Sequence, residues 1–434
     1  MPVTVYPAPE GVEPSPHYRL EADGDSVFVH ACSCASYAMF EAEGPVEVAV
    51  EVAFEFERAV VRPLRRGIEP ERTDTGLRFA LKAPALLSVE LDGDLSRPLF
   101  IWAAPPEEDA PAPGEEGVRF FQAGTVHEPG LMEMGSGETV YIEGGAMVRG
   151  AVLAEGAEDV TVRGRGVLDG SAWSREGDDS GPRMLRFIDC RNVRVEGLAL
   201  VDSPRWTLVP TGCDGVEIEG VKIITDHVGG DGVDLVGCRN AVVEDCFFRT
   251  ADDCVAIKAS AHGHECGGRD VENIRVRRCV CWNAKPGNGV EIGYETRCDA
   301  MTDIAFEDLD LIHVQYEGWQ SGGALTIHNG DRAEISNVRY EDIRIEGAEE
   351  KLIDLKILYA RYSRDPQRGQ IRDVHFRDIA VVDGMFPVSV IRGWDGDHLI
   401  EDVSIENLTV HGRPIRNANE AKMVVELARN VRFE

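Results

Sequence analysis

The fold of this chain is indicated by a phrase that begins at Cys190 and reads Cys-Arg-Asn-Val-Arg-Val-Glu-Gly-Leu-Ala-Leu. It returns from Cys213 as Cys-Asp-Gly-Val-Glu-Ile-Glu-Gly-Val-Lys-Ile, and from Cys238 as Cys-Arg-Asn-Ala-Val-Val-Glu-Asp-Cys-Phe-Phe. In each copy apolar and polar residues alternate, the chain bends, and a second short apolar run follows, which is the pattern of two short β-strands. The Asn or Asp before the first strand suits a bend that needs a left-handed backbone or a side-chain hydrogen bond.

The phrase recurs along most of the chain. Its Asn/Asp-equivalent position falls at 159, 192, 215, 240, 273, 303, 337, 373 and 402, in steps of 23 to 36 residues. One such unit cannot bury its apolar face, whereas a stack of units can. A propeller blade would give longer steps near 40 residues together with hairpin signals. The repeat therefore predicts an all-β protein whose main part is a parallel β-helix.

The first part of the chain lacks this phrase. Alternating runs such as Val46–Val52 and Leu87–Leu91 indicate strands, and a Pro-rich run over 105–114 is typical of a linker. We therefore expect a small N-terminal antiparallel β-sandwich in residues 1–112 and the β-helix domain in residues 113–434.

The composition excludes several classes of partner. The chain has 434 residues with 45 Lys+Arg and 77 Asp+Glu, a net charge of −32, which repels phosphate backbones and anionic lipids. We expect no nucleic-acid or membrane partner. Eleven cysteines, an odd number, do not form a disulfide framework, and no secretory leader is recognisable. These features favour a cytoplasmic protein, although a chain from which a leader had been removed would look the same and would be secreted.

Three aspartates fall at matched places of neighbouring repeats. Asp231 lies in Gly229–Asp234, and 21 residues later Asp252 and Asp253 lie in Thr250–Lys258. Adjacent residues on a straight strand point to opposite faces, so both Asp252 and Asp253 can face one groove only at a bend or bulge. Clustered carboxylates raise at least one pKa, which would give a proton donor beside ionised acceptors, as glycoside hydrolysis requires. Turn-capping aspartates and a Ca²⁺ site are the alternatives.

Taken together, the motifs resemble the polygalacturonase family of glycoside hydrolases, family 28, and also the dextranase-type β-helix enzymes of family 49. The ordered set that carries the resemblance is Val160–Gly170, Ser203–Trp206, Gly230–Asp234 and Asp252–Lys258. The resemblance covers about residues 117–410. It implies a right-handed β-helix and single-displacement hydrolysis with inversion, and we expect no cofactor. It also implies that Asp252 is the general acid and that Asp231 and Asp253 hold and activate water.

Two departures from the family pattern bear on the substrate. Asn288 stands where the pattern has the His of a Gly-His-Gly, and the stretch Gly323–Asp331 lacks the Arg-x-Lys that grips substrate carboxylates. With a net charge of −32, these absences favour a neutral glycan, such as a dextran-like or other glucan, a fructan or an arabinan-type polymer.

Several further residues are candidates for substrate binding. Asn288, Glu291 and His328 lie on the two coils after the acid pair and could hydrogen-bond sugar hydroxyls, unless they are ordinary turn and strand-edge polar residues. Lys258 could hold the carboxylates ionised. Aromatic rings provide apolar platforms for sugars, and the best candidates are Tyr316 and Trp319.

A loop after the acid-bearing strand carries His264, which could line the same groove. A zinc site is a weaker alternative, because the spacing of its candidate ligands matches no standard pattern: His262, His264, Cys266, Cys279 and Cys281. We expect no metal. The N-terminal domain could cover the groove or mediate a homo-oligomer.

An oligo- or polysaccharide is thus the expected partner, and an inverting glycoside hydrolase is the leading function. A fructotransferase-like transferase or a polysaccharide lyase is the enzymatic alternative. A carbohydrate-binding β-helix without catalysis is the alternative from another class.

Overall fold

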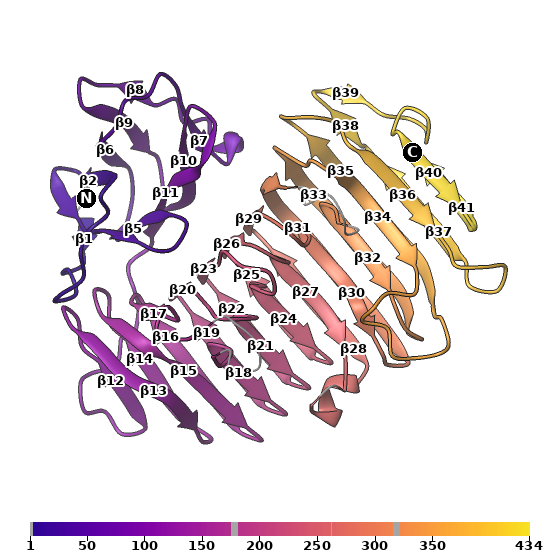
Figure 1. Cartoon of the computed structure of the whole chain (residues 1–434), viewed down its shortest axis with the longest axis horizontal. Helices are drawn as coiled ribbons and strands as arrows, with labels where there is room; N and C mark the ends of the chain where they lie inside the picture. The colour runs from indigo at the N-terminus through magenta and orange to yellow at the C-terminus, as the bar shows by residue number, and fades with distance from the viewer. Residues whose placement is uncertain (1–2, 175–180, 262, 316–321) are drawn as a thin grey trace.

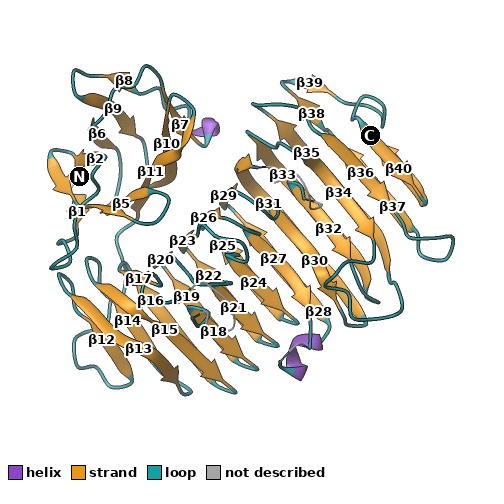
Figure 2. Ribbon diagram, viewed as in Figure 1, coloured by secondary structure: helices purple, strands orange, loops and turns teal. Residues whose placement is uncertain are grey.

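The computed structural model describes residues 3–174, 181–261, 263–315 and 322–434, which form a β-sandwich followed by a parallel β-helix (Figure 1). Strands make up almost all of the regular structure, and the two 3₁₀ turns are η1 (Leu64–Arg66) and η2 (Glu265–Gly268) (Figure 2). No helix in these residues is long and apolar enough to cross a membrane. The predicted all-β architecture is confirmed.

The N-terminal domain consists of two facing sheets. One sheet has the order β1-β5-β11-β10-β7, with β4 also paired to β5, and contains β1 (Val3–Val5), β4 (Val29–Ala31), β5 (Ser36–Ala42), β7 (Ala59–Arg62), β10 (Ala85–Leu91) and β11 (Asp94–Ala104). The other has the order β3-β2-β6-β9-β8 and contains β2 (Tyr18–Ala22), β3 (Asp25–Val27), β6 (Val46–Val52), β8 (Glu71–Arg72) and β9 (Gly76–Leu81). All pairs are antiparallel except β5 with β11, so the first sheet is mixed.

The β-helix starts at β12 and is built of three parallel stacks. The stack that packs against the sandwich contains β13 (Val126–Met134), β15 (Met147–Glu155), β17 (Val167–Asp169), β20 (Ala199–Val201), β23 (Lys222–Ile224), β26 (Phe247–Thr250), β29 (Val280–Asn283) and β38 (Thr409–Val410). The stack that carries the aspartates continues from β15 through β18 (Leu185–Ile188), β21 (Leu208–Thr211), β24 (Val233–Val236), β27 (Val255–Ala259), β30 (Val290–Thr296), β32 (Leu325–Asn329), β34 (Lys351–Ile357), β36 (Val388–Arg392) and β40 (Met423–Glu426).

The third stack holds the strands that open each repeat phrase. It contains β12 (Val118–Phe121), β14 (Thr139–Ile142), β16 (Glu158–Gly164), β19 (Arg191–Glu196), β22 (Asp214–Glu219), β25 (Arg239–Glu244), β28 (Val271–Arg277), β37 (Ile400–Glu406) and β41 (Ala428–Phe433). Three long strands serve the first and third stacks together, namely β31 (Ala300–Val314), β33 (Glu334–Ile345) and β35 (Gln370–Val381). An antiparallel pair joins β38 to β39 (Arg413–Pro414).

The repeated Asn and Asp residues have the left-handed backbone that the sequence predicts, but they lie at the second or a later residue of each strand and not before it. Asn192, Asn240 and Asn273 have φ values of 52°, 52° and 57°, in the left-handed region. Their amides also stack, since Asn273 Nδ2 donates to Asn240 Oδ1 at 2.8 Å. The residues that follow alternate inward and form one continuous apolar core along the helix axis. Each repeat therefore contributes both a bend and a layer of core.

The sandwich packs against the N-terminal half of the β-helix and also reaches later coils, since Arg62 pairs with Glu346 and Arg65 pairs with Asp308 (Figure 1). Phe100 and Trp102 of β11 project onto Phe247 of β26, with ring centroids 4.8 and 5.5 Å apart. The last sandwich strand ends at Ala104 and the first helix strand begins at Val118, so the expected boundary at 112/113 falls in the segment between them. This contact leaves the aspartate-bearing stack uncovered by the sandwich core.

Candidate active site

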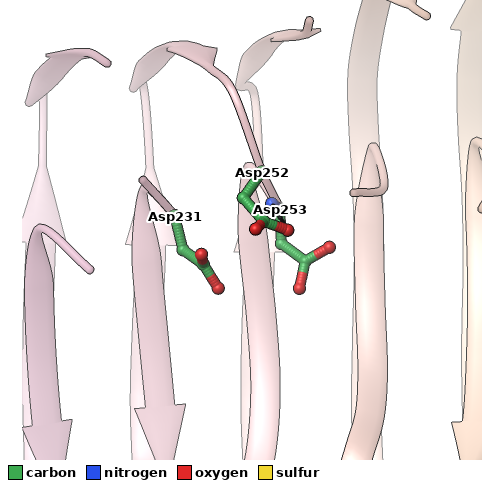
Figure 3. Close-up of side chains that lie close together, drawn as sticks. All are labelled: Asp231, Asp252 and Asp253. Carbon is green, nitrogen blue, oxygen red and sulfur yellow. Dashed lines mark hydrogen bonds between the residues drawn. The ribbon is translucent and has the colours of Figure 1, made fainter. Parts of the chain in front are cut away.

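The three aspartates lie at the bends that lead into two neighbouring strands of one stack. Val233 of β24 pairs with Val255 of β27, which puts Asp231 and Asp253 in the same register one coil apart. The backbone ladder extends to them, since Gly232 N–H donates to the Asp253 carbonyl at 2.9 Å. Asp252 sits one residue earlier, in a bend, as the sequence predicts. Figure 3 shows Asp231 on one coil and the other two side chains on the next.

Each carboxylate has a defined donor. The Gly229 N–H donates to Asp252 Oδ2 at 2.8 Å. Asn288 binds Asp253 Oδ1 twice, through its backbone N–H at 2.9 Å and its side-chain amide at 2.7 Å. Lys258 Nζ contacts Asp231 Oδ2 at 2.9 Å. The bends and strand β27 thus hold the cluster rigidly before any ligand arrives.

Lys258 lies inside a group of carboxylates. Besides Asp231, its Nζ is 2.8 Å from Asp234 Oδ1 and 3.8 Å from Asp253 Oδ2, and only 6% of its side chain is exposed. Burial opposes its charge, but Asp231 and Asp234 raise the pKa of Lys258 well above its usual value. The charge of Lys258 lowers the pKa of Asp234 and of Asp253, in the direction that the sequence predicts, although burial raises both more strongly. Because the ammonium already neutralises this spot, it disfavours a divalent cation there.

Burial distributes protons unevenly over the cluster. Burial, followed by the charge of Asp231, raises the pKa of Asp252 to about 7. The same two causes raise the pKa of Asp253 and of Asp234 well above the ordinary value. One oxygen from each of Asp231, Asp252 and Asp253 lies within 4.8 Å of the others. At neutral pH the cluster can therefore hold at least one dissociable proton beside an ion-paired carboxylate.

The cluster opens into a cavity of about 230 Å³. Trp206, two residues before β21, forms one wall, and the Lys258 ammonium lies 4.0 Å from the centre of its ring. The other lining residues are Val228, Gly229, Asp231, Asp252, Asp253, Gly287, Asn288, Tyr294, Glu295 and Tyr362. Gly287 has φ +101°, and a side chain there would clash with the backbone of Asp252. A ring wall beside carboxylates is suited to a sugar.

Asn288 lines the cavity, as the sequence predicts, but Glu291 and His328 do not. Both are fully buried and do not line the cavity. His328 Nδ1 is 3.0 Å from Glu291 and its Nε2 is 3.1 Å from Asp354. The ring of Tyr294 stacks on His328 at 4.5 Å and separates it from the cavity. The expected direct contact of Glu291 and His328 with sugar is therefore wrong. The two residues lie beneath the Tyr294 ring and support it.

The buried network is electrically balanced. Burial disfavours the charged imidazole, but Glu291 and Asp354 raise the pKa of His328 to about 9. Thr326 donates to Glu291, and Lys356 Nζ lies 2.9 Å from Asp354 Oδ2. Thr326 and His328 lie in the stretch that lacks the Arg-x-Lys. The charges of His328, Glu291 and Asp354 in this region pair with one another and with Lys356.

The remaining candidate residues do not lie together in one site. Tyr316 and Trp319 lie outside the described residues, and so does His262. His264 lines an adjoining cavity, where Arg186 Nη2 is 2.7 Å from its Nε2. Cys279 and Cys281 are buried in the helix core, away from the surface loop of His264 and Cys266, so these residues form no common metal site.

Sequence reasoning missed several lining residues. Trp206 stood in a quoted motif, and its Ser-Pro-Arg-Trp context could have marked it as a wall. No motif in the sequence pointed to Arg183, Tyr362 or Arg364. These residues come from irregular segments whose paths the repeat does not specify.

The fold and the carboxylate cluster together define a β-helix glycoside hydrolase scaffold. The family model described as Glycosyl hydrolases family 28 matches residues 135–422, well over half of the chain. The chain belongs to that family, and the resemblance drawn from its motifs is confirmed.

Similar proteins agree with this assignment. A polygalacturonase of Juniperus ashei is 28% identical over 239 residues, covering 51% of this chain and 44% of that protein. Rhamnogalacturonase A of Aspergillus niger is 31% identical over 164 residues, covering 37% and 33%. The chain spans about half or less of the length of such curated relatives.

Solved structures share the fold. Dex49A from Penicillium minioluteum aligns over 99% of this chain and 96% of its own, with a TM-score of 0.68 and 15% identity. A hyperthermoactive exopolygalacturonase from Thermotoga maritima covers 73% and 84%, with a TM-score of 0.59 and 19% identity. At these identities the likeness shows the right-handed β-helix fold alone.

Proposed function

We propose that this chain hydrolyses a glycosidic bond of an oligo- or polysaccharide, with Asp252 as general acid and with Asp231 and Asp253 holding and activating the attacking water. The observation that carries the proposal is the contrast inside the cluster. Burial and the charge of Asp231 raise the pKa of Asp252 to about 7, so Asp252 can hold a proton at neutral pH. Asp231 meanwhile forms an ion pair with Lys258 at 2.9 Å. One group can donate to the leaving oxygen while another accepts from water.

We propose a single displacement with inversion, because two carboxylates beside the acid can share one water. The observation favouring a second candidate, a double displacement through Asp231, is the short separation. One oxygen of each aspartate lies within 4.8 Å of the others. Inverting pairs are typically about 6.5–9.5 Å apart and retaining pairs about 5–5.5 Å. The anomer formed first, followed by ¹H NMR during hydrolysis, decides between the two.

The experiment is a panel of neutral and acidic glycans incubated with wild-type protein, Asp252→Asn and the control Asp74→Asn. Asp74 is an exposed residue of the sandwich. On the substrate that is cleaved, Asp252→Asn should lower kcat by about 10²–10⁴-fold, and Asp74→Asn should leave it unchanged. Since Asp252 must be protonated to act, wild-type kcat should also decline as the pH rises through about 7. Near-wild-type turnover by Asp252→Asn would overturn the assignment.

The same panel separates the alternative functions. A lyase would release products with a new unsaturated chromophore, and a transferase would form new glycosides instead of free sugar. Binding that is unaffected by Asp252→Asn, with no product from any glycan, would indicate a carbohydrate-binding β-helix.

A further inference from the structure

A lysine interrupts the apolar ladder that the β-helix presents to the sandwich. Lys222 of β23 pairs with Ala199 of β20 on one side and with Phe247 of β26 on the other, and Phe247 pairs with Val280 of β29. These strands lie side by side beneath the sandwich (Figure 1). Only 4% of Lys222 is exposed. Because a buried lysine is costly, its place between Ala199 and Phe247 calls for a physical reason.

The amine of Lys222 has few partners. Its Nζ donates to the Gly197 carbonyl at 2.9 Å, and no carboxylate forms an ion pair with it in the parts of the chain that the structure describes. Burial, followed by the charge of Arg165, lowers the pKa of Lys222 from 10.5 to about 7. A large share of the amine is then neutral at neutral pH, and a neutral buried amine is a nucleophile. The other groups that act on this pKa oppose the shift, namely Cys246, Glu196 and Glu41.

Arg165 lies beside this amine, in the turn between β16 and β17. Gly197, which accepts the hydrogen bond from Lys222, also carries the Arg165 guanidinium against its Cα, since a side chain at Gly197 would clash with Arg165 Nη1. Arg165 has only long contacts with carboxylates, because its Nε is 3.4 Å from Glu41 and its Nη1 is 4.0 Å from Glu196. Two incompletely compensated cations therefore meet at Gly197.

Both cations line a cavity of about 350 Å³ between the sandwich and the β-helix. The sandwich contributes an apolar wall from β10 and β11. The remaining charged residues on the walls are Arg65, Arg66, Glu196, Glu219, Asp245 and Arg278. With Arg165 and Lys222 included, five basic side chains face three acidic ones in this cavity. The cavity thus has room for a small ligand and an excess of positive charge that favours an anion.

We propose that Lys222 is a modification site for carbon dioxide, whose amine forms a carbamate inside this cavity. The lone pair of Nζ attacks the carbon of CO₂ and an N–C bond forms. The electron pair of one C=O π bond moves to its oxygen, which becomes negative, and one proton leaves Nζ for the solvent. The N–H that remains on the nitrogen can still donate to the Gly197 carbonyl. The modification lies on a different stack from the aspartates and does not depend on the proposed hydrolysis.

The charges at Gly197 favour carbon dioxide over other electrophiles. An aldehyde would convert the amine into an imine, which is neutral or positive and keeps the repulsion from Arg165. A carbamate is negative, so it replaces that repulsion by an ion pair that a guanidinium can form through two parallel hydrogen bonds. Arg66 of η1 lines the same cavity from the sandwich, so the carbamate would lie between cations of both domains. The small exposed fraction of Lys222 also favours a reactant of three atoms.

The test is ¹³C NMR of the whole chain in ¹³C-labelled bicarbonate, which supplies CO₂, at pH 7.5. We expect a carbamate resonance that is lost in Lys222→Met and in Lys222→Arg, since a guanidinium stays protonated. The exposed control Lys82→Met should keep it. Arg165→Gln should raise the CO₂ concentration for half-occupancy about 10-fold or more, because hydrogen bonds between charged groups are of that strength. The α-amino group also forms a carbamate, so the assignment comes from the difference between spectra.

A second measurement needs no variant. Ethylation of the carbamate by a trialkyloxonium salt, followed by peptide mass spectrometry, should place the ester on Lys222 of the wild-type protein, so the test holds even where a variant fails to fold. Equal carbamate resonances in wild-type protein and Lys222→Met would overturn the inference. So would an ester found only on other amines, or a half-occupancy that Arg165→Gln leaves unchanged.

Discussion

Replacing Lys258 by methionine would remove a buried cation from the centre of the aspartate cluster while keeping the length of the side chain. Its Nζ lies 2.9 Å from Asp231 Oδ2 and 2.8 Å from Asp234 Oδ1, and its side chain is 6% exposed. Removing one partner of a buried ion pair typically costs about 3–5 kcal/mol, because the other charge is left without compensation. We expect a loss of this size in the free energy of unfolding at pH 8.

The loss in the free energy of unfolding should be smaller at lower pH, because the neighbouring carboxyl groups then take up protons. Burial raises the pKa of Asp234 and of Asp253 above the ordinary 3.8, so the folded protein keeps protons that the unfolded chain has released. Such groups make the protein less stable as the pH rises from about 4 through their folded pKa. Without Lys258 these pKa values rise further, so the loss of stability continues to a higher pH. At pH 5 protonation replaces the missing cation, so the difference from wild type should be smaller.

The measurement is urea unfolding of wild-type protein, Lys258→Met and the exposed control Lys82→Met at pH 5 and pH 8. Lys82→Met should match wild type at both. Adding Asp234→Asn to Lys258→Met removes one uncompensated carboxyl and should recover at least about 1 kcal/mol relative to additivity. A loss below about 1 kcal/mol at pH 8, or an equal loss at both pH values, would refute the electrostatic account of the cluster.

Two further predictions concern the residues behind the cluster. Asn288→Ala removes the amide donor to Asp253 but leaves the backbone donor, so kcat should fall about 10-fold with little change in KM, because Asn288 positions Asp253 beside the attacking water. An unchanged kcat in steady-state assays would contradict this role. His328→Gln should destabilise the fold fully below pH 6.5 and progressively less as the pH rises through about 9, because the folded pKa of His328 lies above its usual 6.5. Unfolding at pH 6 and pH 10 checks this, and a loss that is larger at pH 10 would show that the imidazole is neutral in the folded state.

The repeat made the aspartates predictable. In a stack of parallel strands, a sequence separation close to one coil becomes a spatial separation of one strand spacing. Asp231 and Asp253 are therefore neighbours because Val233 pairs with Val255, and the bend at Asp252 follows from two adjacent acids having to share a face. The Asn bends were predictable for the same reason, since their side chains repeat with the coil.

Two features could not be predicted from the repeat. Alternation predicts that Glu291 and His328 point outward, and they do so, but the Tyr294 ring stacks on His328 and buries it. Arg364 belongs to a loop between β34 and β35, and its approach to the site depends on anchors such as Asp331 on another coil. Periodicity specifies the direction of a strand side chain, but neither what covers it nor where a long loop travels.

The charges around the site are arranged differently on its two sides, and this difference indicates where ligand binding supplies stability. On the coils after the aspartates, His328 is enclosed by Glu291 and Asp354, and such balanced pairs need no ligand. On the coils before them, Arg183 and Arg186 are partly buried without a carboxylate partner in the described chain. A partly buried cation without a carboxylate partner costs stability, so the charges on these coils are less well compensated than those on the coils after the aspartates. The net charge of −32 acts in the opposite sense, because it repels an anionic glycan at a distance. Added salt should therefore speed the association of an anionic glycan, because it screens this repulsion.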